Sequence, residues 1–229
     1  MSDVSSVEIR VAESSSLFGP GDALLKEFEA QYPEVQVSAR GDQVKLSGPT
    51  QQVAVARKLL DQMAELVKRG QLLSPEDFRR AARMLQGDSE ARPADILSQS
   101  ILSSRGKSIR PKTIGQKNYV DAIDQNTIVF GIGPAGTGKT YLAMAKAVQA
   151  LQRKEVSRII LTRPAVEAGE RLGFLPGTLN DKIDPYLRPL FDALHEMLEP
   201  EAVPKLMASG TIEVAPLAYM RGRTLNDSF

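Results

Sequence analysis

The chain has 229 residues, of which 42% are hydrophobic and 25% are charged, an ordinary composition for a globular protein with a buried core. It contains no cysteine, which excludes disulfide frameworks, thiolate zinc sites and cysteine nucleophiles. The formal net charge is +1, so any contact with nucleic acid must come from a local cluster of cations. No apolar run reaches the roughly 20 residues of a membrane span, and the N-terminus lacks the pattern of a secretory signal. We therefore expect a cytoplasmic protein without membrane contact.

Residues 1–72 are predicted to form a small domain of β-α-β-β-α order. Val7, Ile9 and Val11 alternate with polar residues, as in a half-buried strand, and a helix is predicted to follow. Residues 34–48 read as two strands around a tight turn at Arg40-Gly41-Asp42. An amphipathic helix then precedes Gly70.

Residues 73–108 are predicted to be a short helix followed by a basic linker. Ser74 is placed as the helix cap with Pro75 in the first turn, and residues 88–97 read as connecting chain. Between Ser98 and Lys117 there is no acidic residue, and the basic residues are Arg105, Lys107, Arg110, Lys112 and Lys117. This tract predicts either contact with a polyanion or a solvated linker.

Residues 109–229 alternate strand-like and helix-like patterns, which favours a parallel α/β sheet. A helix is predicted near 116–125, and the apolar run 126–132 is predicted to be a buried strand. A further helix follows residue 138. Two more strands are predicted, within 157–166 and 210–220, with a proline-interrupted helical segment between them.

Residues 133–140, "GPAGTGKT", fit the phosphate-loop pattern G-x-x-x-x-G-K-[ST]. Glycines allow the backbone to curl around a polyphosphate, so that the backbone N–H groups of the loop surround it. The residues predicted to bind the nucleotide in this way are Gly133, Pro134, Ala135, Gly136, Thr137 and Gly138, of which the proline has no N–H to donate. Lys139 is predicted to reach the β- and γ-phosphates of ATP, and the Thr140 hydroxyl to ligate Mg²⁺. We therefore predict ATP and Mg²⁺ as cofactors, with Lys139 and Thr140 as the catalytic residues.

Three longer stretches, "GIGPAGTGKTYLAMAKAV", "IILTRPAVEAGERLGFLPGTLNDKIDPYLRPLFDAL" and "IEVAPLAYMRGRTLND", resemble the PhoH family of P-loop ATPases. The resemblance implies a RecA-like core over 109–229, preceded by a KH-like α+β domain. It also implies ATP hydrolysis in RNA metabolism, with helicase-like remodelling and a link to phosphate starvation. RNA, a YbeY-type endoribonuclease and further copies of the chain are the partners that it implies.

The resemblance also assigns roles outside the loop. Gln116 matches the glutamine that contacts adenine in related helicase cores, although a helix-capping glutamine is the alternative. Arg163, at the end of a predicted strand, is a candidate for contact with RNA or the γ-phosphate. Arg221 and Arg223 are candidates for contact with RNA or with a neighbouring subunit's ATP.

Hydrolysis in this class needs a strand that ends in acidic residues, and no such strand follows Thr140. We therefore expect a chain truncated before that strand, able to bind ATP but slow to hydrolyse it. The predicted N-terminal domain also lacks the G-x-x-G loop with which KH domains hold RNA.

Two alternatives to an ATPase remain. The chain is either a non-catalytic module that senses ATP and docks RNA or protein, or, less in keeping with the resemblance, a small-molecule kinase.

Overall fold

The computed structural model describes residues 4–10, 17–19, 22–88, 90–104, 107–164 and 179–229, without side-chain detail for Arg10, Lys107 and 179–187. The fold is mixed α/β, with helices and small sheets. The chain divides into two compact units, which are Met1–Ser100 with Arg110–Asn118, and Ile101–Ile109 with Tyr119–Phe229.

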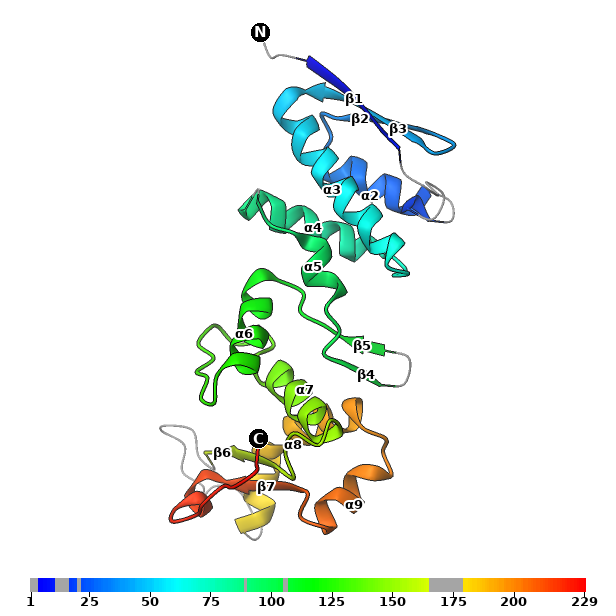
Figure 1. Ribbon diagram of the computed structural model, residues 1–229. Coiled ribbons are helices and arrows are strands. Elements are labelled where there is room, and N and C mark those ends of the chain that lie inside the picture. The colour runs from blue at the N-terminus through cyan, green and yellow to red at the C-terminus, as the bar shows by residue number, and fades with distance from the viewer. Residues whose placement is uncertain (1–3, 11–16, 20–21, 89, 105–106, 165–178) are drawn as a thin grey trace. The chain divides into compact units, whose positions relative to one another are not determined.

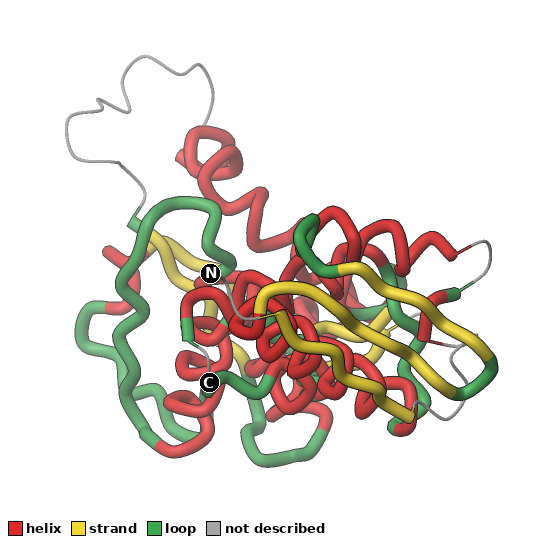
Figure 2. The backbone as a smooth tube through the Cα atoms, turned by 90° about the horizontal axis from the view of Figure 1, so that it is seen from above, coloured by secondary structure: helices red, strands yellow, loops and turns green. Residues whose placement is uncertain are grey.

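The first unit contains a three-stranded antiparallel sheet in the order β1-β3-β2, whose strands lie side by side in Figures 1 and 2. Ile9 lies opposite Val44, and Val37 lies opposite Leu46. The predicted pair of strands around the Arg40–Asp42 turn is confirmed. The strands are β1 (Val4–Arg10), β2 (Gln36–Arg40) and β3 (Gln43–Pro49).

The helices of the first unit enclose its core. Helix α3 packs against β1 and β3, and α4 packs against α2 and α3. Phe28, Met63 and Phe78 are fully buried between them. Gly48 permits the close contact of β3 with Glu34, because a Cβ there would lie 2.5 Å from the Glu34 carbonyl oxygen. The helices are α2 (Ala23–Gln31), α3 (Thr50–Lys68), α4 (Pro75–Gly87) and α5 (Pro93–Ser98).

The Ser74 cap is confirmed as a reciprocal capping box. The Asp77 backbone N–H donates to Ser74 Oγ, and the Asp77 carboxylate accepts from the Ser74 N–H at 2.9 Å. The prediction of connecting chain over 88–97 is wrong in part, because α5 begins at Pro93. Pro93, Ala94, Ile96 and Leu97 are buried, but six residues are too few to show a helical period in the sequence.

The second unit begins with a short hairpin and ends with a pair of parallel strands, in which Ile159 lies opposite Ile212. Helix α6 starts in the first unit and continues into the second. The elements are β4 (Leu102–Ser104), β5 (Lys107–Ile109), α6 (Ile114–Gln125), α7 (Lys139–Gln152), β6 (Ile159–Arg163), α8 (Leu179–Met197), α9 (Ala202–Ala208), β7 (Ile212–Pro216) and the 3₁₀ helix η3 (Leu217–Met220).

Polar contacts around the buried Lys146 join α6, α7 and the residue that precedes β4. Lys146 on α7 is only 7% exposed and forms an ion pair with Asp124 near the end of α6. Its ammonium also donates to the side chain of Gln149, which in turn donates to the Ile101 carbonyl oxygen. This chain of contacts fixes α7, the helix that follows the predicted phosphate loop.

The prediction of a buried strand over 126–132 is wrong. Ile128, Phe130 and Ile132 are 74%, 83% and 95% exposed, and the run has no regular secondary structure. A strand requires a backbone partner, and among the described residues no strand pairs with this run. The second edge of β6 instead pairs with the end of the chain, where the Ile160 N–H donates to the Phe229 carbonyl oxygen at 3.0 Å.

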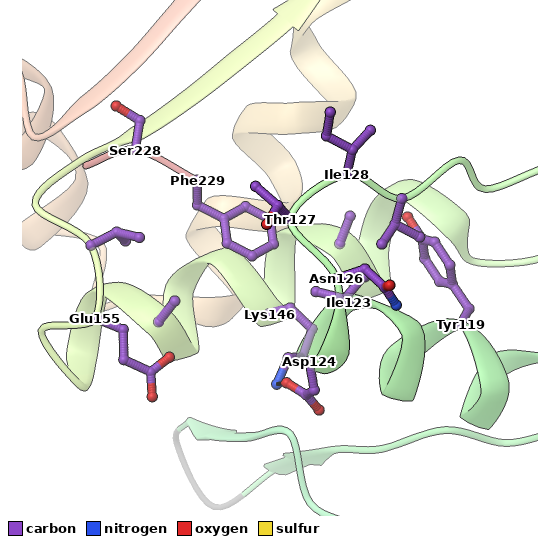
Figure 3. A pocket seen from close by; sticks show the side chains of 14 residues that line it. Tyr119, Ile123, Asp124, Asn126, Thr127, Ile128, Lys146, Glu155, Ser228 and Phe229 are labelled. Atoms are coloured by element: carbon purple, nitrogen blue, oxygen red, sulfur yellow. Dashed lines mark ion pairs between the residues drawn. The ribbon is translucent and has the colours of Figure 1, made fainter. Parts of the chain in front are cut away.

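A cavity of about 530 Å³ separates the run from the last residues of the chain (Figure 3). Asn126, Thr127 and Ile128 line one side, and Ser228 and Phe229 line another. Within the described part of the chain, no helix is long and apolar enough to cross a bilayer.

Candidate functional site: the phosphate loop

The phosphate loop, residues 133–140, adopts a conformation that depends on glycine. Gly136 and Gly138 have φ values of 76° and 82°, in the left-handed region that other residues rarely adopt. Gly138 is the N-cap of α7, which begins at Lys139 and has 14 residues. The unpaired amides at the start of this helix, and its dipole, favour an anion at the loop.

The loop holds the Lys139 ammonium in place. Its Nζ donates to the carbonyl oxygens of Gly133 at 2.9 Å and Pro134 at 2.7 Å. The Thr137 hydroxyl donates to the same Pro134 oxygen at 3.0 Å. A phosphate oxygen would compete with these two carbonyls for the ammonium, and as a charged acceptor it would make the stronger hydrogen bond.

A cavity of about 560 Å³ adjoins the loop and brings Lys139, Thr140 and Arg163 together. Arg163 ends β6, and Leu190 of α8 also lines the cavity. Among its described lining residues, two are cations and none is acidic. These residues are Ala135, Gly136, Gly138, Lys139, Thr140, Tyr141, Met144, Thr162, Arg163, Pro189, Leu190 and Ala193.

Tyr141 adds a neutral hydrogen-bonding group to this cavity. Burial, together with a hydrogen bond to the Glu196 carboxylate, raises the pKa of the Tyr141 phenol to about 12. The phenol therefore stays protonated at neutral pH and does not add a negative charge near the loop.

These residues fit a magnesium polyphosphate. The fit rests on the N-terminus of α7 at the loop, the Lys139 ammonium, the exposed Thr140 hydroxyl and the lack of acidic residues among the described lining residues. Among the described residues no group of three or more His, Cys, Asp or Glu could hold a metal ion. Thr140 would be one oxygen ligand of Mg²⁺, with the remaining ligands from phosphate and water, as Mg²⁺ prefers.

Gln116 lies in the first unit, and its position relative to the phosphate loop is not defined. Its side-chain oxygen accepts a hydrogen bond from the Lys112 N–H at 2.6 Å. Its own N–H donates to the Thr113 hydroxyl at 3.1 Å, at the start of α6. These contacts are those of a helix-capping residue, so the adenine role stays a prediction.

Arg221 and Arg223 do not line the cavity at the loop. Arg223 forms a two-point ion pair with Glu213 on β7, with Nη2 and Oε2 2.7 Å apart. This guanidinium holds the pKa of the Glu213 carboxyl below its usual range. Arg221 is exposed in the turn after η3. The pairing of Glu213 with Arg223 was not predicted from the sequence. The only sequence feature that could have indicated it is that Glu213 lies ten residues before Arg223.

Comparison with known proteins places this site in a family. The sequence pattern of the family described as "PhoH: PhoH-like protein" matches residues 108–229. A PhoH-like protein of Mycobacterium tuberculosis is 60% identical over 225 residues, which cover 98% of this chain and 64% of the relative. The chain therefore spans about two thirds of the length of that relative.

More distant relatives give the same result. A PhoH-like protein of Bacillus subtilis is 48% identical over 218 residues, which cover 95% of this chain and 68% of the relative. Protein PhoH of Escherichia coli is 44% identical over 115 residues, which cover 49% of this chain and 32% of the relative.

Proposed function

The chain belongs to the PhoH-like protein family, and from that premise we propose that it binds Mg²⁺ and ATP at the phosphate loop. The observation that carries the proposal is the cavity in which Lys139, Thr140 and Arg163 meet beside α7, without an acidic lining residue among those described. A cavity with this charge suits a polyphosphate better than a neutral or cationic ligand.

Each residue has a distinct part in this proposal. The loop amides bind the β-phosphate, Lys139 bridges the β- and γ-phosphates, and Thr140 ligates Mg²⁺. Arg163, which lines the same cavity, would neutralise charge on the γ-phosphate, since a guanidinium matches phosphate geometry. Bound Mg²⁺ would supply charge neutralisation at the phosphates.

The finer features of the fold are part of the same proposal. Residues 109–229 would correspond to a RecA-like core, with Gln116 as the residue that contacts adenine, and residues 1–72 to a KH-like domain. Its strand and helix order, β1-α2-β2-β3-α3, is compatible with that correspondence. A KH-like domain without the G-x-x-G loop would contact RNA or protein by another surface.

For the whole protein we propose ATP hydrolysis coupled to RNA remodelling in the cytoplasm, with a homo-oligomer as the working form. A YbeY-type endoribonuclease is a further proposed partner. The second candidate function is ATP sensing without hydrolysis. The exposed run containing Ile128, Phe130 and Ile132 favours it for this chain, because the backbone before the loop is not held in a sheet.

The test is nucleotide binding by a Lys139→Ala variant, measured by isothermal titration calorimetry with ATP and Mg²⁺. We expect the dissociation constant to rise at least about tenfold, a loss of roughly 1.4 kcal/mol. Lys205→Ala is the matched control, because it removes an exposed lysine from α9 in the same unit. Unchanged affinity in the Lys139 variant would contradict the proposed site.

Hydrolysis separates the two candidate functions. Mg²⁺-dependent ATP turnover would be measured for this chain and for the full-length Mycobacterium tuberculosis relative, each with and without RNA. We expect RNA-stimulated turnover in the longer protein and little in this chain. Tight binding without turnover in both proteins would favour the sensing function.

A further inference from the structure

A second cationic cavity lies in the first unit, apart from the phosphate loop. Its volume is about 380 Å³, and its walls are α4 and the short segment 112–115 that leads into α6. Because these segments lie far apart in sequence, the cavity is created only by folding. Its lining residues are Glu76, Arg80, Arg83, Met84, Gly87, Lys112, Thr113, Ile114 and Gly115.

The charges of this cavity are unbalanced. Its lining holds the three cations Arg80, Arg83 and Lys112 but the single carboxylate of Glu76. Arg80 contacts that carboxylate at 3.3 Å, and Arg79 also pairs with it at 2.9 Å. Arg80 also lies 3.9 Å from the Asp77 carboxylate, and Arg79 also pairs with Glu27 at 3.4 Å, so the charges of both arginines are compensated.

Arg83 and Lys112 are left without compensation. Among the described residues, neither side chain has an ion pair or a hydrogen bond with another residue. Two like charges that line one cavity disfavour each other, and an anion bound between them would remove that cost.

The segment that carries Lys112 is held in a fixed conformation. Arg110 donates to the Leu97 carbonyl oxygen at 3.0 Å, and the Lys112 N–H donates to the Gln116 side chain at 2.6 Å. Met84, only 6% exposed, and Ile114 give the cavity apolar contact surface. The cavity thus combines two exposed cations, one of them on a backbone segment held by hydrogen bonds, with an apolar surface.

We propose that this cavity binds the phosphodiester backbone of single-stranded RNA, with phosphates at Arg83 and Lys112 and a ribose or base against the partly exposed Ile114. A concave site of this size admits a flexible single strand more readily than a rigid duplex. The basic tract that contains Lys112 carries further cations on both sides along the chain. The choice of RNA as the polyanion rests on the proposed function, whereas the cavity is independent of the ATP site.

The test is fluorescence anisotropy with a short labelled oligouridylate over a range of salt concentrations. The variant is Arg83→Gln with Lys112→Gln. We expect its dissociation constant to rise about tenfold, and the slope of log K against log salt to fall by roughly 1.4, since each lost contact with a single strand contributes about 0.7. Lys26→Gln with Arg40→Gln is the control, because it removes the same charge from exposed positions in the same unit.

Further measurements make the outcome decisive. Arg83→Lys with Lys112→Arg should retain binding, and the glutamine variant should bind ATP like the unaltered chain. Lys139→Ala should lose ATP while it retains RNA binding, and a Lys139→Ala variant that keeps its ATP affinity would contradict the ATP proposal without affecting the RNA proposal. The RNA proposal would be overturned by an unchanged affinity and salt slope in the glutamine variant. It would also be overturned if inorganic phosphate or duplex RNA displaced the oligouridylate as well as unlabelled single strand does.

Discussion

The conformation of single glycines controls the phosphate loop. Gly136 has a φ of 76° and open space around the position of a Cβ. A side chain there would meet no steric clash but would have to adopt the left-handed region, at a cost of about 1–2 kcal/mol. The loop would then be strained or would flatten, and its backbone N–H groups would no longer face a bound phosphate.

Gly136→Ala is therefore expected to weaken ATP binding about tenfold, as measured by calorimetry. Gly87→Ala is the matched control, because its Cβ also meets open space and its φ is not positive. We expect ATP binding by the control to equal that of the unaltered chain. Equal weakening in both variants would argue against a role for the loop conformation.

A buried phenol makes the first unit sensitive to alkali. Tyr32 is 3% exposed, and burial raises its pKa to about 12. In the unfolded chain the phenol titrates near pH 10, so between about pH 10 and 12 the unfolded state releases the proton more readily. Stability must therefore fall as the pH rises through this range.

Tyr32→Phe is predicted to reduce that fall and to stabilise the first unit by up to about 1 kcal/mol at neutral pH. The Tyr32 hydroxyl has no hydrogen-bond partner among the described residues, and an unsatisfied buried donor is costly. Denaturant unfolding at pH 7 and above pH 10 measures both effects. A loss of stability at pH 7 would show that the hydroxyl has a partner.

At the scale of the helices, the ion pair between Asp124 and Lys146 connects α6 to α7. Removing the carboxylate leaves a buried ammonium without its charged partner, which is more costly than removing both charges. The exposed pair of Arg57 and Asp61 in α3, with 3.7 Å between Arg57 Nε and Asp61 Oδ2, has no such penalty.

Asp124→Asn is therefore expected to destabilise the second unit by roughly 1–3 kcal/mol. Adding Lys146→Met to this variant should recover much of that loss. Asp61→Asn, the exposed control, should change stability by less than about 0.5 kcal/mol. Denaturant unfolding of the unaltered chain, Asp124→Asn, Lys146→Met, the double variant and Asp61→Asn provides the comparison. Additive losses in the double variant would exclude a direct coupling of the two side chains.

At the scale of the whole molecule, two separate hydrophobic cores coexist in one chain. Phe28, Leu60 and Phe78 belong to the core of the first unit, while Val148 and Leu194 belong to that of the second. Units with separate cores can unfold in separate steps. A ligand that binds one native unit stabilises that unit.

We predict two calorimetric unfolding transitions. Mg²⁺ with ATP should raise the midpoint temperature of only the transition that belongs to the second unit. Phe28→Ala should lower the midpoint temperature of the other transition, with a loss of about 3–5 kcal/mol in the free energy of unfolding of the first unit. It should leave the ATP affinity unchanged. Val148→Ala is the matching change in the second core and should lower the ATP-sensitive transition. A single transition that shifts in every variant would indicate one cooperative unit.

Long amphipathic helices and tight turns were predictable because their signals are local. The amphipathic helix α3, the Ser74 cap of α4 and the β2–β3 turn are confirmed. The irregular conformation of 126–132 was not predictable, because an apolar run becomes a strand only when another strand pairs with it. The ion pair of Arg223 with Glu213 likewise required the return of the chain through η3 to β7.

The sequence by itself determined the family, through its long matches, and the phosphate loop, whose glycines and cation follow one another within eight residues. Only the tertiary structure decided that Arg163 shares a cavity with Lys139, that Arg223 is paired, and that Arg83 lines a cavity with Lys112. A local motif is encoded in consecutive residues, whereas the meeting of distant charges depends on how the packed elements bring them together.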